Sequence, residues 1–192
     1  MNYDILVNKR NPLGSEYIPE NLVEVQGPTG EKMDPNYINK MDFLAYRFFL
    51  EMQKAALEEG YEVFIDSSYR SYEYQQRLFV DLVLKKGYYY ALKYCAMPGS
   101  SEHQTGLAID IILRRNGIMI DNFDESDPEI EWLITNSYNY GYILRYPKNK
   151  QSITGYSYEP WHYRFCCPAL ATLLHDNDET LEEYYIRQRI KE

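Results

Sequence analysis

Two short segments hold two of the three histidines of this 192-residue chain, together with acidic side chains. The first runs from Ser101 through His103 to Asp110, and the second joins Glu159 to His162. Two imidazoles and one carboxylate make up the three-ligand set of a catalytic zinc ion, which keeps a fourth position open for water. The two segments therefore predict a hydrolytic zinc site, with one carboxylate as a ligand and the other as a base.

The first segment is predicted to be a loop that leads into a buried strand. Gly106 interrupts the segment, and this disfavours a helical zinc motif in which two histidines share one helix face. Residues Leu107 to Leu113 form an almost unbroken apolar run in which Asp110 is the one charged residue. A carboxylate buried there without a partner costs on the order of several kcal/mol. We therefore expect Asp110 to lie against a cation.

The second segment is also predicted to be extended, because Pro160 disfavours a helix there. Aromatic residues alternate in it with His162 and Arg164. Side chains of a strand point alternately to opposite faces. A strand would therefore send Trp161 and its aromatic neighbours to one face, and His162 with Arg164 to the other. The neighbours in question are Tyr163 and Phe165.

Each of these residues also has a structural interpretation that involves no metal. A single histidine such as His103 in a loop is more often a structural residue than a ligand. Asp110 alone could be the ion-pair partner of Arg114 or Arg145. Glu159 could only begin a turn. The joint occurrence of the four residues in two segments favours the zinc site over these alternatives.

Several motifs in combination resemble the zinc D-Ala-D-Ala carboxypeptidases of the VanY type. They extend along most of the chain, and its length and ending look most like the VanXY-like D,D-dipeptidase/D,D-carboxypeptidases. In one departure, Ser68 stands where the family usually has glycine, and serine also tolerates a turn. The motifs are Ser101-x-His103-x6-Asp110, Glu159-x-x-His162, Ser68-Tyr69-Arg70-Ser71, Leu6-Val7-Asn8-Lys9 with Pro12-Leu13, Gly141 to Pro147, Ile153-Thr154-Gly155, and Tyr158 to Arg164.

The resemblance implies an α+β fold, a single domain over residues 1–192 with a central antiparallel sheet and helices packed around it. This fold is shared with D-Ala-D-Ala dipeptidases and the hedgehog signalling domain. The coarse pattern predicts helices, a hairpin and short strands in agreement with such a domain. The expected elements are a helix from Asp34-Pro35 to Gly60, a strand at 61–66, a helix capped by Ser71 and ending at Lys86 with Leu78, Leu82 and Val83 inward, a helix at 88–94, a hairpin of 107–113 with 118–120, a helix at 127–140, a strand at 142–146, and a terminal helix begun by Thr180 and Glu183.

The roles of the site residues follow from the chemistry and the resemblance together. Zinc would be held by His103, Asp110 and His162. It lowers the pKa of a bound water from 15.7 to about 7. Glu159, three residues before a ligand, is placed to take the water proton and pass it to the leaving amine.

The resemblance adds three further residues to the predicted site. It implies that Arg70 stabilises the oxyanion, and that Gln75 and Ser101 hold the terminal carboxylate or the backbone of the substrate. The alternative for Arg70 is an ion pair with Asp66 or Glu73 at the start of a helix. Arg164 is expected on the same strand face as His162, where it could fix the orientation of the histidine without binding the metal itself.

The resemblance implies a D,D-carboxypeptidase that removes the terminal D-Ala from peptidoglycan precursor pentapeptides, with D-Ala-D-Ala dipeptide as a further substrate. Two alternatives keep the fold, namely an L,D-carboxypeptidase and a peptidoglycan endopeptidase. A third is a non-catalytic zinc-binding or peptide-binding domain. Such a module has no need of a base, so Glu159 favours catalysis. The sequence predicts neither the stereochemical preference nor the oligomeric state.

Composition excludes other classes of function. Lys and Arg number 20 against 29 Asp and Glu, the net charge is −9, and no basic run stands out, so nucleic-acid binding is disfavoured. No apolar run has the length of a membrane span, and the first ten residues lack a signal-peptide pattern. These features predict a cytoplasmic protein; loss of an export signal from the start of the sequence would instead mean the cell surface.

The remaining cysteines and histidine are predicted to be structural. Three cysteines, two of them adjacent, form no disulfide framework and suit a reducing compartment. Cys166 and Cys167 are expected to be buried small residues at a strand end rather than metal ligands. His175 lies in a polar tract outside both segments and is expected to be a solvated surface residue.

Overall fold

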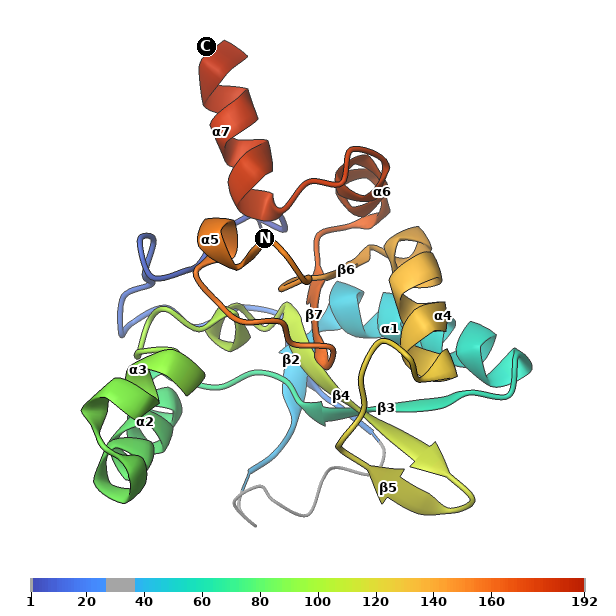
Figure 1. Cartoon of the computed structure of the whole chain (residues 1–192), viewed down its shortest axis with the longest axis horizontal. Helices are drawn as coiled ribbons and strands as arrows, with labels where there is room; N and C mark the ends of the chain where they lie inside the picture. The colour runs from blue at the N-terminus through green and yellow to red at the C-terminus, as the bar shows by residue number, and fades with distance from the viewer. Residues whose placement is uncertain (1, 27–36, 192) are drawn as a thin grey trace.

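A five-stranded antiparallel sheet lies at the centre of the molecule and carries two of the predicted metal ligands, Asp110 and His162 (Figure 1). The computed structural model describes residues 2–26 and 37–191. In chain order the elements are β1 (Leu22–Glu24), β2 (Lys40–Asp42), α1 (Phe43–Glu58), β3 (Glu62–Ser67), α2 (Tyr72–Lys86), α3 (Tyr88–Tyr94), the 3-10 turn η1 (Glu102–Thr105), β4 (Ala108–Arg115), β5 (Ile118–Ile120), α4 (Pro128–Asn136), the 3-10 turn η2 (Ser137–Tyr140), β6 (Tyr142–Leu144), α5 (Gln151–Thr154), β7 (His162–Phe165), α6 (Pro168–Asp176) and α7 (Leu181–Lys191).

The strands of the main sheet are ordered β3-β4-β7-β6, and β5 pairs with β4 in the predicted hairpin. Every pairing in this sheet is antiparallel. The strands β1 and β2 form a separate antiparallel pair. The predicted α+β architecture, with helices around an antiparallel sheet, is confirmed. Over the residues that the structure describes, no helix combines the length and apolar character that a bilayer crossing requires.

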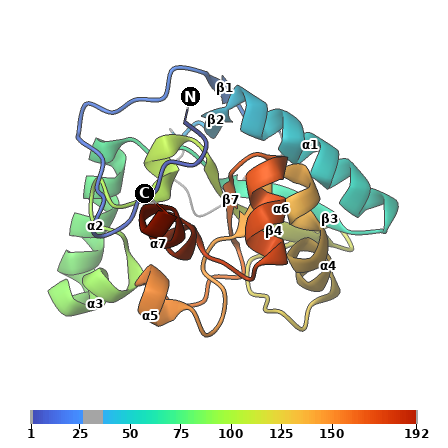
Figure 2. The ribbon, with the colours of Figure 1, turned by 90° about the horizontal axis from the view of Figure 1, so that it is seen from above.

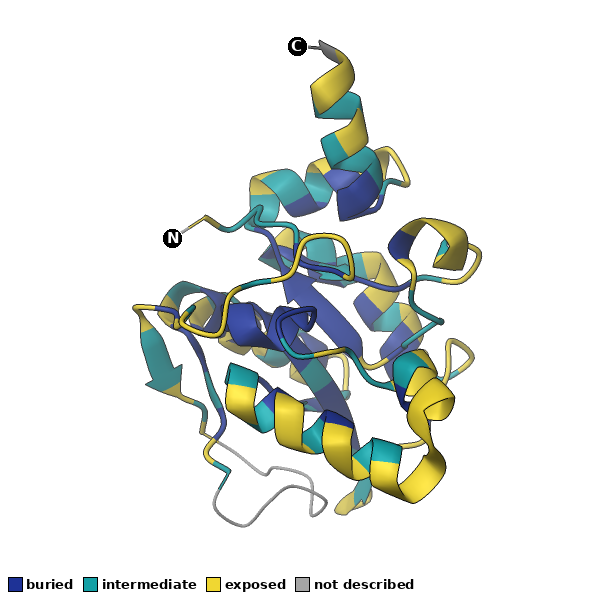
Figure 3. Ribbon diagram, turned by 90° about the vertical axis from the view of Figure 1, so that its left-hand side faces the viewer, coloured by how far each residue is buried: buried dark blue, intermediate teal, exposed yellow. Residues whose placement is uncertain are grey.

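Alternation along β4 and β7 separates the core from the other face of the sheet. Ile109, Ile111 and Leu113 of β4 join Tyr163 and Phe165 of β7 in one buried cluster with the inner faces of α1 and α4. Figure 3 shows these strands as the buried centre of the molecule, with exposed residues on the outer faces of the helices. The alternate residues of both strands therefore point away from α1 and α4. The helices α2 and α3 lie together at the end of the molecule away from α1 and α4 (Figure 2).

The first helix begins at Phe43, so the predicted start near Asp34 is wrong. Asp42 is its N-cap, with a side chain that accepts hydrogen bonds from two backbone amides of the first turn. Met41, which fits the helical spacing, lies instead in β2 and is buried in the core. The Asp34-Pro35 pair lies outside the described residues. Pairing with β1 takes the segment before Asp42 out of the helix.

The other predicted helix boundaries are largely confirmed. Ser71 caps α2 by accepting from the amide of Tyr74, and Gly87 ends that helix. Thr180 and Glu183 form the predicted capping box at the start of α7, because each side chain accepts a hydrogen bond from the backbone amide of the other.

The packing of α2 differs from the prediction. Leu78, Leu82 and Val83 are half-buried, whereas Gln75 and Phe79 are the buried side chains of this helix. Two element lengths also differ: α4 ends at 136 and gives way to η2, and β6 stops at 144. The helix α6 is a further element that the sequence pattern did not predict.

Candidate active site

Strand register brings Asp110 and His162 directly opposite each other on β4 and β7. Both residues occupy positions that point away from the core, so their side chains meet on the same face of the sheet. The Nδ1 atom of His162 lies 3.0 Å from Oδ1 of Asp110. The predicted separation of His162 from the aromatic face is thereby confirmed for Tyr163 and Phe165.

His103 reaches the same point from the 3-10 turn η1, which immediately precedes β4. Gly106 ends this turn in the left-handed region at φ +70°, where a Cβ would lie 2.8 Å from the side chain of Leu22. The Nδ1 atom of His103 lies 2.6 Å from the carbonyl oxygen of Ser68. That hydrogen bond leaves Nε2 of His103 facing Asp110, at 3.3 Å from its Oδ2.

The three predicted ligands fit a zinc ion. One ligand atom each from His103, Asp110 and His162 can be chosen so that all lie within 4.8 Å of one another. Two imidazole nitrogens and one carboxylate oxygen are ligands that zinc accepts. The contact of His103 with the Ser68 carbonyl is also typical of a metal ligand, because it fixes the tautomer and the ring orientation.

The protonation of the two histidines differs in the metal-free protein. Burial, together with the positive charge of Arg70, lowers the pKa of His103 to about 4, so its ring is neutral at pH 7. Burial also acts to lower the pKa of His162, but the neighbouring carboxylates of Asp110 and Glu102 outweigh it and raise that pKa to about 9. A metal ion therefore displaces a proton from His162 and none from His103.

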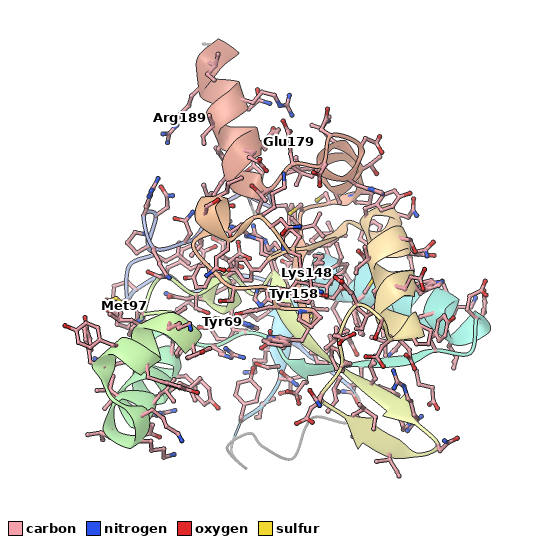
Figure 4. The ribbon with its side chains drawn as sticks, in the orientation of Figure 1. Tyr69, Met97, Lys148, Tyr158, Glu179 and Arg189 are labelled. Carbon is pink, nitrogen blue, oxygen red and sulfur yellow. The ribbon has the colours of Figure 1, made fainter. Side chains whose placement is uncertain are left out.

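Glu159 lies beside the three-residue group on the loop between α5 and β7. Its Oε2 atom is 3.9 Å from Nδ1 of His162, and its backbone amide donates to the carbonyl of Tyr146. Burial raises the pKa of Glu159 to about 7, and the negative charge of Asp110 acts in the same direction. Tyr158, its neighbour in the loop, lies under the ammonium group of Lys148, 5.0 Å from the ring centre; the two are labelled in Figure 4.

Arg70 contacts the ligand group directly. Its Nη2 donates to Oδ2 of Asp110 at 2.5 Å, and its Nε donates to Oγ of Ser67 at 3.0 Å. The expectation that Asp110 lies against a cation is thus confirmed. The alternative partners proposed for Asp110 are wrong, because Arg114 pairs with Glu62 and Arg145 pairs with two other carboxylates.

A cleft of about 230 Å³ joins all of the predicted residues. Gln75 is buried in its wall and donates to the carbonyl of Ala96 and the thiol of Cys95, while its Oε1 atom has no hydrogen-bond partner within residues 2–26 and 37–191. Ser101 lines the same cleft. The complete lining is Arg70, Gln75, Lys93, Tyr94, Cys95, Ala96, Ser101, Glu102, His103, Asp110, Tyr146, Tyr156, Glu159, Trp161 and His162.

Trp161 and Arg164 depart from the predicted strand pattern. Trp161 precedes β7, is 38% exposed and lines the cleft, so it does not share the core face with the other aromatic residues. Arg164 points to the face of His162, but its Nη1 donates to Glu102 and not to the histidine. Ser68, at the position where glycine was expected, has no left-handed backbone conformation.

Glu102 is a residue of this site that the sequence pattern does not reveal. Its side chain is fully buried, and its Oε1 accepts hydrogen bonds from Nε of Arg145 at 2.8 Å and Nη1 of Arg164 at 2.9 Å. Burial acts to raise its pKa, but the two guanidinium groups outweigh it and hold that pKa well below the usual range. The available signal is its place in the chain, between the predicted residues Ser101 and His103.

The cysteines and the third histidine behave largely as predicted. Cys166 is buried in a small cluster with Leu174 and Leu181 as expected, whereas Cys167 is only half-buried; neither belongs to the metal group. His175 is exposed and its ring lies 3.7 Å from that of Tyr138, centre to centre. The thiol that does reach the cleft is that of Cys95, which the sequence did not single out.

The sequence profile of the VanY family, described as D-alanyl-D-alanine carboxypeptidase, matches residues 38–168. The chain belongs to the VanY family. The matched range includes all predicted metal ligands, the predicted base Glu159 and the residues predicted to contact the substrate. The predicted resemblance is therefore confirmed.

YodJ of Bacillus subtilis (strain 168) is a relative of this chain, 44% identical over 182 residues, which are 94% of this chain and 66% of that protein. The chain thus spans just under two thirds of the length of this relative.

Solved structures of VanY-like proteins share the fold. The LdcB LD-carboxypeptidase is 42% identical with a TM-score of 0.84, over 94% of this chain and 84% of that one. A D,D-pentapeptidase VanY from a VanB-type vancomycin resistance cassette is 32% identical with a TM-score of 0.78, over 96% and 99% of the two chains. The latter was solved in complex with Zn(II). Together with the fit of the three ligands, this identifies zinc as the cofactor, as predicted.

Proposed function

We propose that this chain is a zinc-dependent D,D-carboxypeptidase that hydrolyses the terminal D-Ala from peptidoglycan precursor pentapeptides and also accepts D-Ala-D-Ala dipeptide. The observation that carries the proposal is the position of Glu159, a carboxylate with a pKa of about 7, beside a three-ligand metal group in one cleft. The description of the VanY family as D-alanyl-D-alanine carboxypeptidases supports the substrate class.

The chemistry divides between the metal and Glu159. Zinc bound by His103, Asp110 and His162 supplies a Lewis acid and lowers the pKa of water. Glu159 takes a proton from the water that attacks the scissile carbonyl and gives one to the leaving amine as the C–N bond breaks. Its pKa near 7 suits both steps, because a base that must also act as an acid works best near the ambient pH.

Arg70 is proposed to stabilise the transition state. Its guanidinium group borders the metal ligand Asp110 and opens onto the cleft. Negative charge that develops on the carbonyl oxygen would meet this fixed cation, and a donor of this kind is worth roughly 3 to 4 kcal/mol. The side chain is held by Ser67 from behind, so little reorganisation is required.

Gln75 and Ser101 are proposed to hold the substrate. The free atom of Gln75 is its buried Oε1, since both known contacts of its amide use Nε2. An oxygen accepts a hydrogen bond, so it suits a backbone N–H of the peptide rather than its terminal carboxylate. The hydroxyl of Ser101 can donate to that carboxylate.

An L,D-carboxypeptidase is the second candidate. It is favoured by the 42% identity and TM-score of 0.84 to LdcB, which is described as an LD-carboxypeptidase. Both reactions release a C-terminal D-Ala, and they differ in the chirality of the residue before the scissile bond. The same metal group, base and cation serve either substrate.

The test presents four substrates side by side to the zinc-loaded protein: pentapeptide precursor, tetrapeptide, free D-Ala-D-Ala and a cross-linked dimer. Mass spectrometry follows the loss of one alanine from the peptides, the release of free alanine from the dipeptide and the separation of the dimer into monomers. We expect cleavage of the pentapeptide and of the dipeptide. Cleavage of the tetrapeptide alone would establish the L,D activity, cleavage of the dimer alone an endopeptidase, and no cleavage of any substrate a binding domain.

A further inference from the structure

A chain of buried charges runs from the C-terminal helix α7 to the metal group. Glu182 of α7 accepts two hydrogen bonds from the guanidinium of Arg145, at 2.8 and 2.6 Å. Arg145 and Arg164 both donate to one oxygen of Glu102. The side chains of Arg145, Arg164 and Glu102 are 0% exposed. Buried charges of this kind are stable only when each is paired.

The second oxygen of Glu102 faces His162. Its Oε2 atom and Nε2 of His162 lie 3.6 Å apart, and both are buried without a hydrogen-bond partner among the described residues. Nε2 is the ring nitrogen of His162 that points away from the metal group, because Nδ1 is the atom turned toward Asp110. A carboxylate oxygen accepts only, so it favours a proton on Nε2.

We propose that Glu102 is a positioning residue of the zinc centre. It accepts the Nε2–H of His162 and thereby keeps the lone pair of Nδ1 free and aimed at the metal. Neutral imidazole carries one proton, so a proton fixed on Nε2 excludes one on Nδ1. The proposal concerns metal binding and is independent of which peptide the enzyme cleaves.

Three neighbours hold this arrangement in place. Arg145 and Arg164 both donate to Oε1 of Glu102 and so restrain the orientation of its carboxylate, while Oε2 faces His162. The ring of Tyr146 stacks on that of His162 at a centroid distance of 4.9 Å and an interplanar angle of 28°. The imidazole can therefore not turn away from Glu102 without loss of this contact.

Glu102→Gln is the decisive variant. Two arginine donors keep an oxygen at the Oε1 position, so the new amide nitrogen takes the place of Oε2. This nitrogen donates to Nε2 of His162 and forces the ring proton onto Nδ1, where zinc must bind. We expect zinc affinity, measured by competition with a chromogenic chelator, to fall about 10- to 100-fold. Circular dichroism checks that the variant is folded.

Glu182→Gln is the matched control. It removes one charge from the same buried arginine but leaves the oxygen that faces His162 unchanged. We expect it to lower the melting temperature and to keep zinc affinity within about twofold of the wild type, well short of the loss expected for a broken contact behind a ligand. An equal loss of affinity in both variants would overturn the proposal, because general loosening of the core would then explain it.

Glu102→Asp separates geometry from charge, and it also provides the test if the glutamine variant does not fold. Aspartate keeps the negative charge beside the arginines but draws its oxygens back from His162 by one methylene. We expect at least about a tenfold loss of zinc affinity. Wild-type affinity in this variant would show that only charge matters and would refute a positioning role.

Discussion

Glu159 and Asp110 are two carboxylates in one cleft, and their surroundings give them different chemistry. Asp110 contacts Arg70 and both histidines; these contacts outweigh the effect of burial and hold its pKa well below the usual range. Burial is the main influence on Glu159 and raises its pKa to about 7. Environments that push two pKa values apart identify the permanently charged group and the proton carrier.

Replacement of Glu159 tests its role as the base. Glu159→Gln keeps the shape of the side chain but cannot take a proton, so we expect turnover to fall by about 10²- to 10⁴-fold. Zinc content, measured by mass spectrometry of metals after dialysis, should stay close to one per chain. If the variant instead lost its zinc, Glu159 would be a ligand and the base would lie elsewhere.

The activity should depend on pH through the same carboxylate. The base works when deprotonated, so kcat/KM should rise with pH and level off above the pKa of Glu159. That pKa is about 7 without metal, and bound zinc lowers it by favouring the anion, so the midpoint should lie at or below pH 7. Initial rates from pH 4.5 to 8.5 measure this midpoint, and a limb well above pH 7 would contradict the assignment.

The sequence predicts the ligands of the site better than the residues behind them. His103, Asp110 and His162 stand out because their residue types are rare and their chemistry is specific. Glu102 looks like any acidic residue of a turn, since its function depends on Arg145 and Arg164, which lie 43 and 62 positions further along the chain. Only tertiary contacts distinguish a buried carboxylate of this kind from a solvated one.

At the scale of the elements, long patterns predict well and short ones do not. The alternation over β4 and the caps of α2 and α7 are local signals that the structure confirms. The strands β1 and β2 have three residues each, too few to establish a period of two. Met41 therefore fits a helical spacing although it lies in β2 and pairs with Val23 of β1, and the predicted first helix extends too far toward the N-terminus.

A substitution at Gly141 tests how closely the start of β6 packs against Phe165 and Cys167. It has φ +79°, and a Cβ there would lie 2.7 Å from the ring of Phe165 and 2.9 Å from the backbone of Cys167. We expect Gly141→Ala to lower the free energy of unfolding by about 1 to 3 kcal/mol more than Gly117→Ala. Gly117 is the control, because it has φ +78° and nothing within 4 Å of such a Cβ. If chemical denaturation showed equal losses of unfolding free energy for the two variants, the start of β6 would be able to shift and make room for the added methyl group.

For the molecule as a whole, the buried charges predict sensitivity to acid. The pKa of Glu102 is depressed in the folded state, so its contribution to stability is full above the unfolded value of about 4.3 and is lost as pH falls toward the folded value. In metal-free protein, the melting temperatures of wild type and Glu102→Gln should therefore converge as pH drops below about 4.5.

The control for this experiment is Glu58→Gln. Glu58 pairs with Lys54 at the surface, where the two side chains are 68% and 79% exposed. Exposed pairs of this kind contribute little to stability. We expect the melting curves of this variant and the wild type to coincide at every pH. A difference between wild type and Glu102→Gln that stays constant with pH would contradict the role of the charge.

The contacts between the two ends of the chain also constrain how it is made. Asn8 donates to Glu182, and the hydroxyl of Tyr185 donates to the carbonyl of Asp4. During synthesis the residues of the metal group leave the ribosome before α7. Arg145 therefore has no contact with the carboxylate of Glu182 until α7 has emerged. A nascent chain that stops before α7 holds a guanidinium group in its interior without one of its counter-charges. In such a fragment Glu102 is still present to pair with Arg145, so the cost of burying the guanidinium group is only partly offset, and we expect the fragment to be opened by proteases more readily than the chain that includes α7.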